Sequence, residues 1–213
     1  MGIEEIKKRR IVAVIRHAKL DTIIPIAHAL YAGGVSALEI TMETPRAIHV
    51  IEALRTEFTN DVLVGAGTVL DGETARAAIM SGAQFVFSPT VNKETIKMTK
   101  RYGVISVPGA MTPTEILRAY EAGADLIKVF PAHVLGPAYF KAVAGPIPHV
   151  PLMPTGGIDV DNIADYFKAG AVAAGVGSTL VDASREISAD YLLNLTDKAR
   201  LFMEKVQFSK QYS

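Results

Sequence analysis

The stretch AGADLIKVFPA, residues 122–132, sets the pattern on which the fold prediction rests. Gly123 is typical of a residue that ends a helix, and residues 126–130 form a short apolar strand that carries one charge, Lys128. A strand flanked by helices is usually buried on both faces, so an ammonium group there costs on the order of several kcal/mol unless it is paired, or its pKa falls towards neutrality. An easily deprotonated lysine is what Schiff-base chemistry needs. The alternative is that Lys128 reaches solvent from the strand end or pairs with a buried acid.

The same helix-to-strand junction recurs along the chain. The segments AGGV, SGAQ, EAGA and KAGA are spaced by about 20–26 residues or a multiple of it, the length of a βα unit; they occupy residues 32–35, 81–84, 121–124 and 169–172. Eight apolar segments alternate with helical ones. We predict strands at residues 11–15, 37–40, 62–68, 84–90, 104–110, 126–130, 150–157 and 171–178.

A chain of this kind can form a doubly wound sheet or close into a barrel. No dinucleotide fingerprint follows the first strand, and GAGTV at residues 65–69 is not one because Leu70 stands where the third glycine would be. Eight units of near-equal length therefore favour the barrel. We predict an α/β fold, a single (β/α)₈ TIM barrel domain over residues 1–213, with a short amphipathic helix at its N-terminus around Ile3 and Ile6.

Several helix boundaries carry their own signals. Asp21 is a predicted N-cap, and Pro45 suits the first turn of the helix that follows the second strand. Thr112 and Glu115 form a capping box, with Pro113 at the first helical position. Helices are predicted over residues 21–31, 45–58, 71–82, 112–123, 137–143 and 159–170. A further helix follows the fourth strand and ends near residue 102, and a terminal helix follows the last strand.

Composition narrows the class of protein. The 22 basic and 22 acidic residues give a formal net charge of zero, and Lys7–Arg10 is the longest basic run, so no nucleic-acid partner is expected. The absence of cysteine excludes disulfides and thiolate sites and fits a reducing compartment. No apolar run is long enough to span a membrane, and the N-terminus lacks the apolar core of a signal peptide. We expect a cytoplasmic protein with no membrane partner.

The polar residues of the predicted strands gather at one end. In a (β/α)₈ barrel the active site is built at the C-terminal ends of the strands, and charged residues otherwise absent from the strands appear there. The candidates are Arg16, Glu39 with Thr41, Thr68, Ser88 with Thr90, Lys128, Thr155 and Ser178.

Two glycine-containing loops follow the last two strands. PTGGI at residues 154–158 and GVGSTL at residues 175–180 each look able to open a helix, and glycines there let backbone N–H groups approach an anion. Loops in these positions are the recurrent phosphate site of such barrels. The alternative is that the glycines serve only as tight turns.

Glu39 and Lys128 are the remaining charged pair. A carboxylate close to an amine can shuttle protons through carbinolamine and imine steps, whereas a structural buried ion pair is the alternative. The five histidines show no spacing typical of a metal site, so a metal-dependent aldolase is disfavoured and no metal or organic cofactor is expected. Among them, His133 is expected to face solvent in a loop.

Seven segments carry a family resemblance: LEIT with Glu39, GAGTV with Thr68, SP at 88–89, VPG at 107–109, IKVFPA with Lys128, PTGGI and GVGS. Together they resemble the 2-keto-3-deoxy-6-phosphogluconate / 4-hydroxy-2-oxoglutarate aldolases, which are class I aldolases on a (β/α)₈ barrel. The segments lie within residues 11–180 and follow the family's order.

The resemblance implies a role for each matching residue. Lys128 would be the Schiff-base lysine, Glu39 the general acid/base and Thr68 a contact to the pyruvyl carboxylate. Pro89 and Phe130 would shape the substrate pocket. The phosphate site would be formed by the residues of the two glycine loops: Thr155, Gly156, Gly157, Gly177 and Ser178. The resemblance also implies a homotrimer without metal or organic cofactor, with a small keto-acid substrate as its partner.

One position departs from the family's pattern. Many members have an arginine in the loop after LEIT that holds the substrate carboxylate, and this chain has Glu43 there. Arg16 is then the better candidate for carboxylate binding, with Arg46 second. The substitution leaves three substrates open: 2-keto-3-deoxy-6-phosphogluconate, its galactonate epimer, and 4-hydroxy-2-oxoglutarate.

The sequence therefore predicts cleavage of a 2-keto-4-hydroxy acid through an imine on Lys128, with Glu39 removing the C4 hydroxyl proton. The products would be pyruvate and an aldehyde, glyceraldehyde 3-phosphate or glyoxylate. Two alternatives remain at this point: a sugar-phosphate epimerase or isomerase that uses Glu39 without an imine, and a non-catalytic barrel that binds a phosphorylated ligand.

Overall fold

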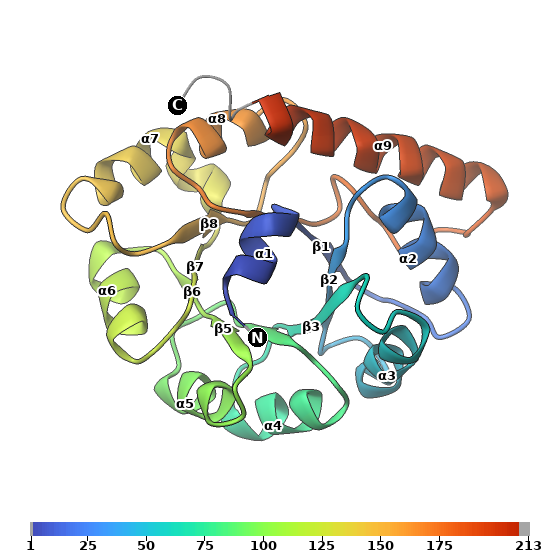
Figure 1. Cartoon of the computed structure of the whole chain (residues 1–213), viewed down its shortest axis with the longest axis horizontal. Coiled ribbons are helices and arrows are strands. Elements are labelled where there is room, and N and C mark those ends of the chain that lie inside the picture. Colours follow the sequence, from blue (N-terminus) through green and yellow to red (C-terminus); the bar gives the residue numbers. More distant parts are fainter. Residues whose placement is uncertain (1, 209–213) are drawn as a thin grey trace.

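The computed structural model describes residues 2–208 and forms a ring of parallel strands surrounded by helices (Figure 1). The strands are β1 (Ile11–Ile15), β2 (Ala37–Thr41), β3 (Leu63–Gly67), β4 (Phe85–Phe87), β5 (Ile105–Val107), β6 (Gly109–Ala110), β7 (Ile127–Val129), β8 (Leu152–Pro154) and β9 (Ala174–Val176). The helices are α1 (Glu4–Arg9), α2 (Ile23–Ala32), α3 (Ala47–Glu57), α4 (Gly72–Met80), α5 (Lys93–Arg101), α6 (Pro113–Glu121), α7 (Ala132–Ala144), α8 (Ile163–Lys168) and α9 (Ala189–Phe208). Within residues 2–208, no helix has the length and apolar character needed to cross a bilayer.

The ring is assembled from two parallel sheets. One has the order β5-β4-β3-β2-β1-β9 and the other the order β6-β7-β8. β5 and β6 are consecutive pieces of one strand, interrupted at Pro108, and a parallel bridge between Thr155 and Gly175 joins the end of β8 to β9. Counting β5 and β6 as one, the described chain forms the eight-stranded α/β barrel that the sequence predicts.

The strand register places the functional side chains. Successive residues of a strand point to opposite faces. Val12, Ala37, Leu63, Phe85 and Leu126 belong to the apolar cluster that fills the barrel interior, while the alternate residues pack against the helices. Glu39 lies two residues after Ala37 and Lys128 two residues after Leu126, so both side chains face the interior of the barrel, nearer its C-terminal end.

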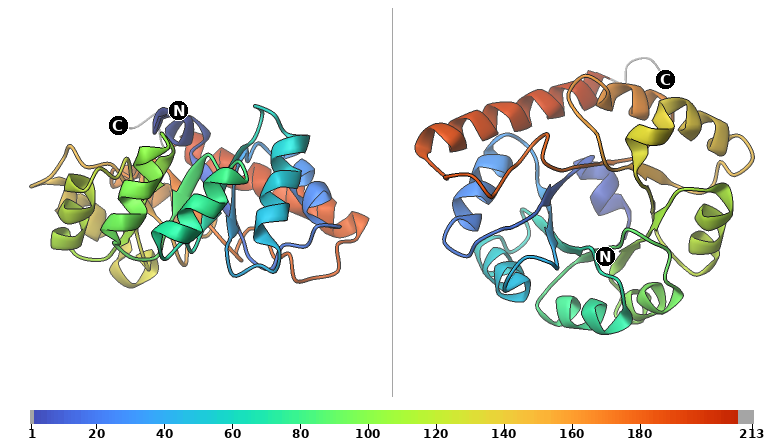
Figure 2. Two further views of the ribbon diagram at one scale, coloured as in Figure 1. Left: turned by 90° about the horizontal axis from the view of Figure 1, so that it is seen from below. Right: turned by 180° about the vertical axis from the view of Figure 1, so that it is seen from behind.

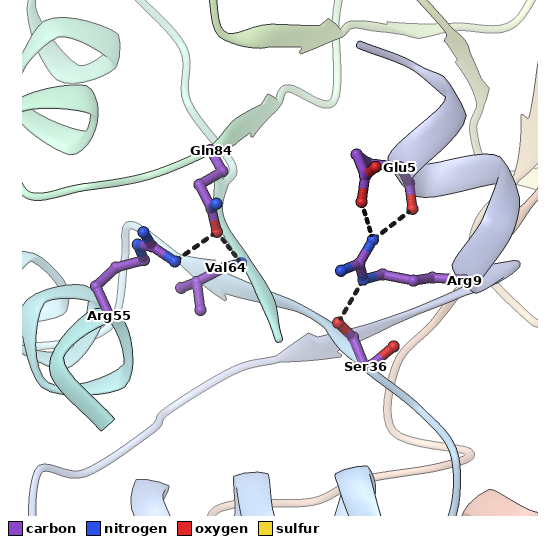
Figure 3. A network of polar contacts seen from close by, with 6 residues as sticks. All are labelled: Glu5, Arg9, Ser36, Arg55, Val64 and Gln84. Atoms are coloured by element: carbon purple, nitrogen blue, oxygen red, sulfur yellow. Dashed lines mark hydrogen bonds and ion pairs between the residues drawn. The ribbon is translucent and has the colours of Figure 1, made fainter. Parts of the chain in front are cut away.

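Helix α1 closes the opposite end of the barrel. It precedes β1 and lies across the N-terminal mouth of the ring in both views (Figures 1 and 2). Ile6 is fully buried in the interior cluster, and Arg9 donates to the backbone oxygens of Glu5 and Ser36 and pairs with the Glu5 carboxylate (Figure 3). These contacts attach α1 to the chain just before β2, so the N-terminal end is sealed and the C-terminal rim is left for loops.

A second polar contact ties the outer shell to the sheet at the same end. The side-chain oxygen of Gln84 accepts from the backbone N–H of Val64 and from Arg55 on α3 (Figure 3). Gln84 therefore extends the pairing of β3 and β4 while it satisfies a guanidinium N–H.

Several predicted helix boundaries are confirmed, because the signals act locally. Asp71 accepts a hydrogen bond from the N–H of Thr74. Thr112 and Glu115 form the expected capping box at the start of α6.

Other predicted boundaries are wrong. Asp21 does not cap α2, whose N-cap position is Thr22, and Pro45 lies before α3, whose N-cap is Arg46. Helix α7 begins at Ala132 instead of near Pro137, with a break at Gly136. Helix α8 starts at Ile163, after PTGGI, and GVGSTL forms a turn closed by the N–H groups of Leu180 and Val181 on the oxygen of Gly177. The loop after β8 is longer than predicted because Gly156 and Gly157, both with positive φ, hold its backbone out of the helical conformation.

Candidate active site

The two candidate catalytic residues come from opposite sides of the ring and meet in its interior. Glu39 is 1% exposed on β2, and Lys128 is 4% exposed on β7. Each acts electrostatically on the other, since the Lys128 charge lowers the pKa of Glu39 and the Glu39 charge raises the pKa of Lys128. The predicted strand lysine is therefore buried rather than solvent-facing, and it faces a buried acid.

Lys128 occupies an aromatic environment. Its Nζ lies 5.6 Å from the ring centre of Phe87 and 5.1 Å from that of Phe130. Within residues 2–208 its ammonium group has no ion-pair or hydrogen-bond partner. Burial lowers the pKa of Lys128 from its ordinary value of 10.5, and the nearby charge of Arg16 acts in the same direction. The lowered pKa favours the neutral, nucleophilic form of this amine relative to that of a lysine in water.

Glu39 fits a space that a glycine leaves open. A Cβ atom at Gly67 on β3 would overlap the Glu39 carboxylate. The Oε2 atom is buried and has no hydrogen-bond partner among the described residues, and burial raises the pKa of Glu39 above its ordinary value of 4.5. An unpartnered buried carboxyl oxygen, close enough to a lysine for the two charges to interact, is suited to exchange protons with a bound molecule.

Thr68 follows β3 directly and is held in a rare conformation. Its φ of 55° is left-handed, which for a β-branched residue costs on the order of 1–3 kcal/mol. The residue is half-buried at the C-terminal end of the barrel. Such strain persists where the surrounding structure holds the backbone in place, and the contact of Thr68 to a substrate carboxylate stays a prediction.

Pro89 and Phe130 line a cavity of about 420 Å³ that also includes Gly109, Met111 and Arg118. Phe130 is also one of the two rings beside Lys128, so it links this cavity to the surroundings of the amine. A larger cavity of about 510 Å³ lies at the other end of the barrel, beside Ile3 of the α1 segment, and contains none of the candidate residues.

The two glycine loops are neighbours in the structure, and their role as a phosphate site stays a prediction. Gly156 and Gly157 have φ of 90° and 72°, a conformation in which consecutive backbone N–H groups can converge on an anion. The hydroxyl of Thr179 donates to the oxygen of Ile158 and joins the two loops. Gly177 borders open space and Ser178 is exposed beside it.

Thr155 and His133 flank the same loops. Thr155 is buried, and its hydroxyl lacks a partner within the described part of the chain. His133, expected in a solvent-facing loop, is exposed on the first turn of α7, where its N–H donates to the oxygen of Gly156. The side chain of His133 leaves no room for a side chain at Gly157, since a Cβ there would overlap the His133 Cβ and lie 2.8 Å from its Cγ.

Arg16 and Glu43 face each other across the rim. Arg16 follows β1, Glu43 follows β2, and Nη1 of the arginine is 3.8 Å from Oε1 of the glutamate. Both charges act on Glu39 and on Lys128. Arg46 instead lines a separate cavity of about 410 Å³ with His17 and its neighbours, so the structure favours Arg16 over Arg46 as a substrate contact.

Three features of the site lie outside what sequence reasoning anticipated. The aromatic contact of Phe87, the space provided by Gly67 and the pairing of Arg16 with Glu43 depend on which strands become neighbours. The glycines of GAGT, in a strand that is otherwise apolar, are the one local signal that could have indicated space for a large side chain. Among residues 2–208, no group of three or more His, Asp or Glu side chains is placed to hold a metal ion.

Substitution of Gly67 by alanine should test the fit between β3 and Glu39. The added methyl group displaces the carboxylate, and we expect kcat/KM to fall by about 100-fold, since a misplacement of about 1 Å can cost that much. Overpacking should also lower the free energy of unfolding by about 1–3 kcal/mol. Steady-state kinetics and urea unfolding provide both values. Gly145→Ala, at the end of α7 where a Cβ meets only ordinary contacts, is the control, and equal activities of the two variants would contradict the role of Gly67.

Comparison with known proteins agrees with this geometry. The family model for "KDPG and KHG aldolase" matches residues 3–193. KDPG stands for 2-keto-3-deoxy-6-phosphogluconate and KHG for 4-hydroxy-2-oxoglutarate. A 2-dehydro-3-deoxy-phosphogluconate aldolase of Treponema pallidum is 39% identical over 189 residues, which are 88% of this chain and 90% of the relative.

Solved structures show the same relationship. A solved structure described as native KDPGal is 30% identical and superimposes with a TM-score of 0.88 over 94% of this chain and 96% of that one. A KDPG aldolase of Legionella pneumophila, whose structure holds pyruvate as a covalent carbinolamine, is also 30% identical, with a TM-score of 0.77 over 94% and 93% of the two chains. By sequence and by fold, the chain belongs to the KDPG and KHG aldolase family, and it is an aldolase, a lyase.

Proposed function

We propose that this aldolase cleaves 2-keto-3-deoxy-6-phosphogluconate, its galactonate epimer or 4-hydroxy-2-oxoglutarate through an imine on Lys128. The observation that carries the proposal is a buried amine without an ion-pair partner in the described chain, facing a buried carboxyl group. The carbinolamine of pyruvate in the Legionella pneumophila enzyme supports the same chemistry.

The reaction begins with attack of the neutral Lys128 amine on the C2 ketone. Loss of water from the carbinolamine gives a protonated imine. Glu39, acting through a water molecule, takes the C4 hydroxyl proton, the C3–C4 bond breaks, and its electron pair moves into the imine to form an enamine. The aldehyde leaves first. The enamine is protonated at C3, and water hydrolyses the resulting imine to pyruvate and the free lysine.

The other residues position the substrate. Thr68 and Arg16 bind the C1 carboxylate at the rim of β1 and β3, and Pro89 and Phe130 bound the pocket. The phosphate of a phosphorylated substrate binds in the two glycine loops: Thr155, Gly156, Gly157, Gly177 and Ser178. Backbone N–H groups in such loops bind phosphate without a metal or organic cofactor.

The proposal extends to assembly and location. Large apolar side chains remain exposed on the helices around the ring, among them Met80, Tyr102 and Leu117, as expected of a surface that meets other subunits. With the family resemblance, this supports a homotrimer. The absence of cysteine supports the cytoplasm.

Borohydride reduction in the presence of pyruvate tests the function directly. We expect a pyruvate-derived mass on Lys128 and on no other lysine, with trapping that reaches half its maximal rate well below pH 10.5. The sign follows from burial, which lowers the pKa of Lys128, so the neutral amine persists as the pH falls through the range where an ordinary lysine becomes protonated. Mass spectrometry of peptides trapped at a series of pH values measures both. An adduct on another lysine, or a midpoint at or above 10.5, would sink the proposal.

A further inference from the structure

Glu43 stands at a fixed place on the rim of the site. It is the third residue of the turn Thr41–Thr44, which is closed by a 3.0 Å hydrogen bond from the N–H of Thr44 to the oxygen of Thr41. The hydroxyls of these two buried threonines lie 3.4 Å apart, and the N–H of Met42 donates to the oxygen of Gly67 on β3. The backbone that carries Glu43 is therefore held from both sides.

The side chain of Glu43 engages the guanidinium that the substrate needs. Its Oε1 is 3.8 Å from Nη1 of Arg16, and both side chains are 53% exposed. Arg16 and Glu43 are also the two outer charges that act on the buried pair Glu39 and Lys128. The charge of Arg16 is thus already shared before a substrate carboxylate arrives.

The charges around the reacting carbons limit what the site accepts. The protonated imine and Arg16 bring two positive charges, which are met by Glu43 and one substrate carboxylate. A second carboxylate attached to C4 would add a negative charge beside the reacting carbons, where Glu43 already stands, and like charges close together in a partly buried site repel each other. A phosphate on C6 lies farther along the chain, where the glycine loops receive it.

We propose that Glu43 is a specificity residue that discriminates against keto acids with a second carboxylate beside the reacting carbons. This inference rests on the proposed function and narrows it. The preferred substrates are 2-keto-3-deoxy acids with one carboxylate and a distal phosphate, and 4-hydroxy-2-oxoglutarate is the disfavoured class.

The test compares three substrates in the wild-type enzyme and in Glu43→Gln and Glu43→Arg. They are 2-keto-3-deoxy-6-phosphogluconate, its unphosphorylated form and 4-hydroxy-2-oxoglutarate, each followed by pyruvate release. In Glu43→Gln we expect kcat/KM to rise about fivefold for the dicarboxylate and less than about twofold for the two monocarboxylates, the size of a screened charge interaction. Glu43→Arg should increase the ratio of kcat/KM for the dicarboxylate to kcat/KM for the monocarboxylates still further. Glu121→Gln, an exposed acid at the end of α6, makes the same change in net charge and should leave the ratio unaltered.

The outcomes separate this inference from the function on which it rests. The specificity role is overturned if the ratio of kcat/KM for the dicarboxylate to kcat/KM for the phosphorylated substrate is the same in both Glu43 variants as in the wild type. It is also overturned if the wild-type enzyme prefers the dicarboxylate. Pyruvate trapping on Lys128 is measured in every variant. If the wild-type enzyme forms no adduct, the imine mechanism is excluded. If the adduct forms but the kcat/KM ratio does not change in the variants, only the role of Glu43 is excluded.

Discussion

Replacement of Lys128 by methionine should lower kcat by about 10,000-fold or more and abolish the pyruvate adduct. The amine is the only group in the proposed mechanism that can form the imine, and without the imine no electron sink exists for the breaking C3–C4 bond. Methionine has nearly the volume of the lysine stem and can fill the space between Phe87 and Phe130. The loss should therefore be chemical, with circular dichroism and cooperative unfolding retained.

Two further variants make this prediction specific. Lys128→Arg keeps a cation but cannot form an imine, and it should be as inactive as methionine. Lys141→Met, at an exposed position on α7, should match the wild-type enzyme. Activity within tenfold of wild type in either Lys128 variant would exclude imine catalysis and revive a reaction that uses Glu39 alone.

Replacement of Glu39 by glutamine should lower kcat by about 100- to 10,000-fold, the range that a positioned acid/base contributes. The amide has the shape of the carboxyl group, so the space beside Gly67 stays filled, but it cannot accept and return a proton. Lys128 remains, and borohydride should still trap pyruvate on it. Because the Glu39 charge raises the pKa of Lys128, its removal should move the trapping midpoint to lower pH and never to higher pH.

Steady-state kinetics and the pH dependence of trapping measure these two effects. Glu52→Gln, an exposed position on α3, serves as the matched control. A Glu39→Gln enzyme with wild-type kcat would show that water or another group moves the proton. A midpoint shifted upward would show that Glu39 does not act on Lys128.

Membership in an aldolase family leaves the two earlier alternatives, an epimerase or isomerase and a non-catalytic phosphate-binding barrel, without support. The joint presence of Lys128 and Glu39 in one interior already argued against both. An epimerase does not need the lysine, and a binding module needs neither residue.

The barrel could be predicted because its signals are repeated and local. The β-branched run at residues 11–15 is β1 as expected, and the junction at Gly123 delivers Lys128 to a buried strand. Alternation along β2 and β7 then decides which side chains point inward, and this needs no knowledge of the neighbours.

Boundaries and pairings could not be predicted in the same way. The strand expected over 104–110 is two pieces, because Pro108 has no N–H for the ladder. Helix α7 begins five residues before Pro137, because the backbone of Ala132 and His133 is fixed by Thr155 and Gly156 of the next βα unit. The Arg16–Glu43 pair likewise joins two loops whose proximity exists only once β1 and β2 are neighbours.

The closure of the ring has a consequence for how this enzyme can fail. Glu39 belongs to the sheet β5-β4-β3-β2-β1-β9 and Lys128 to the sheet β6-β7-β8, and near the rim the bridge of Thr155 with Gly175 joins the end of β8 to β9. Each sheet thus carries one of the two catalytic residues, and neither residue supports the cleavage without the other. The rate of aldol cleavage therefore indicates whether the ring is closed. A change that separates β8 from β9 should abolish activity while each sheet keeps its strands and the helices around it. Loss of activity should therefore precede loss of secondary structure as the protein unfolds.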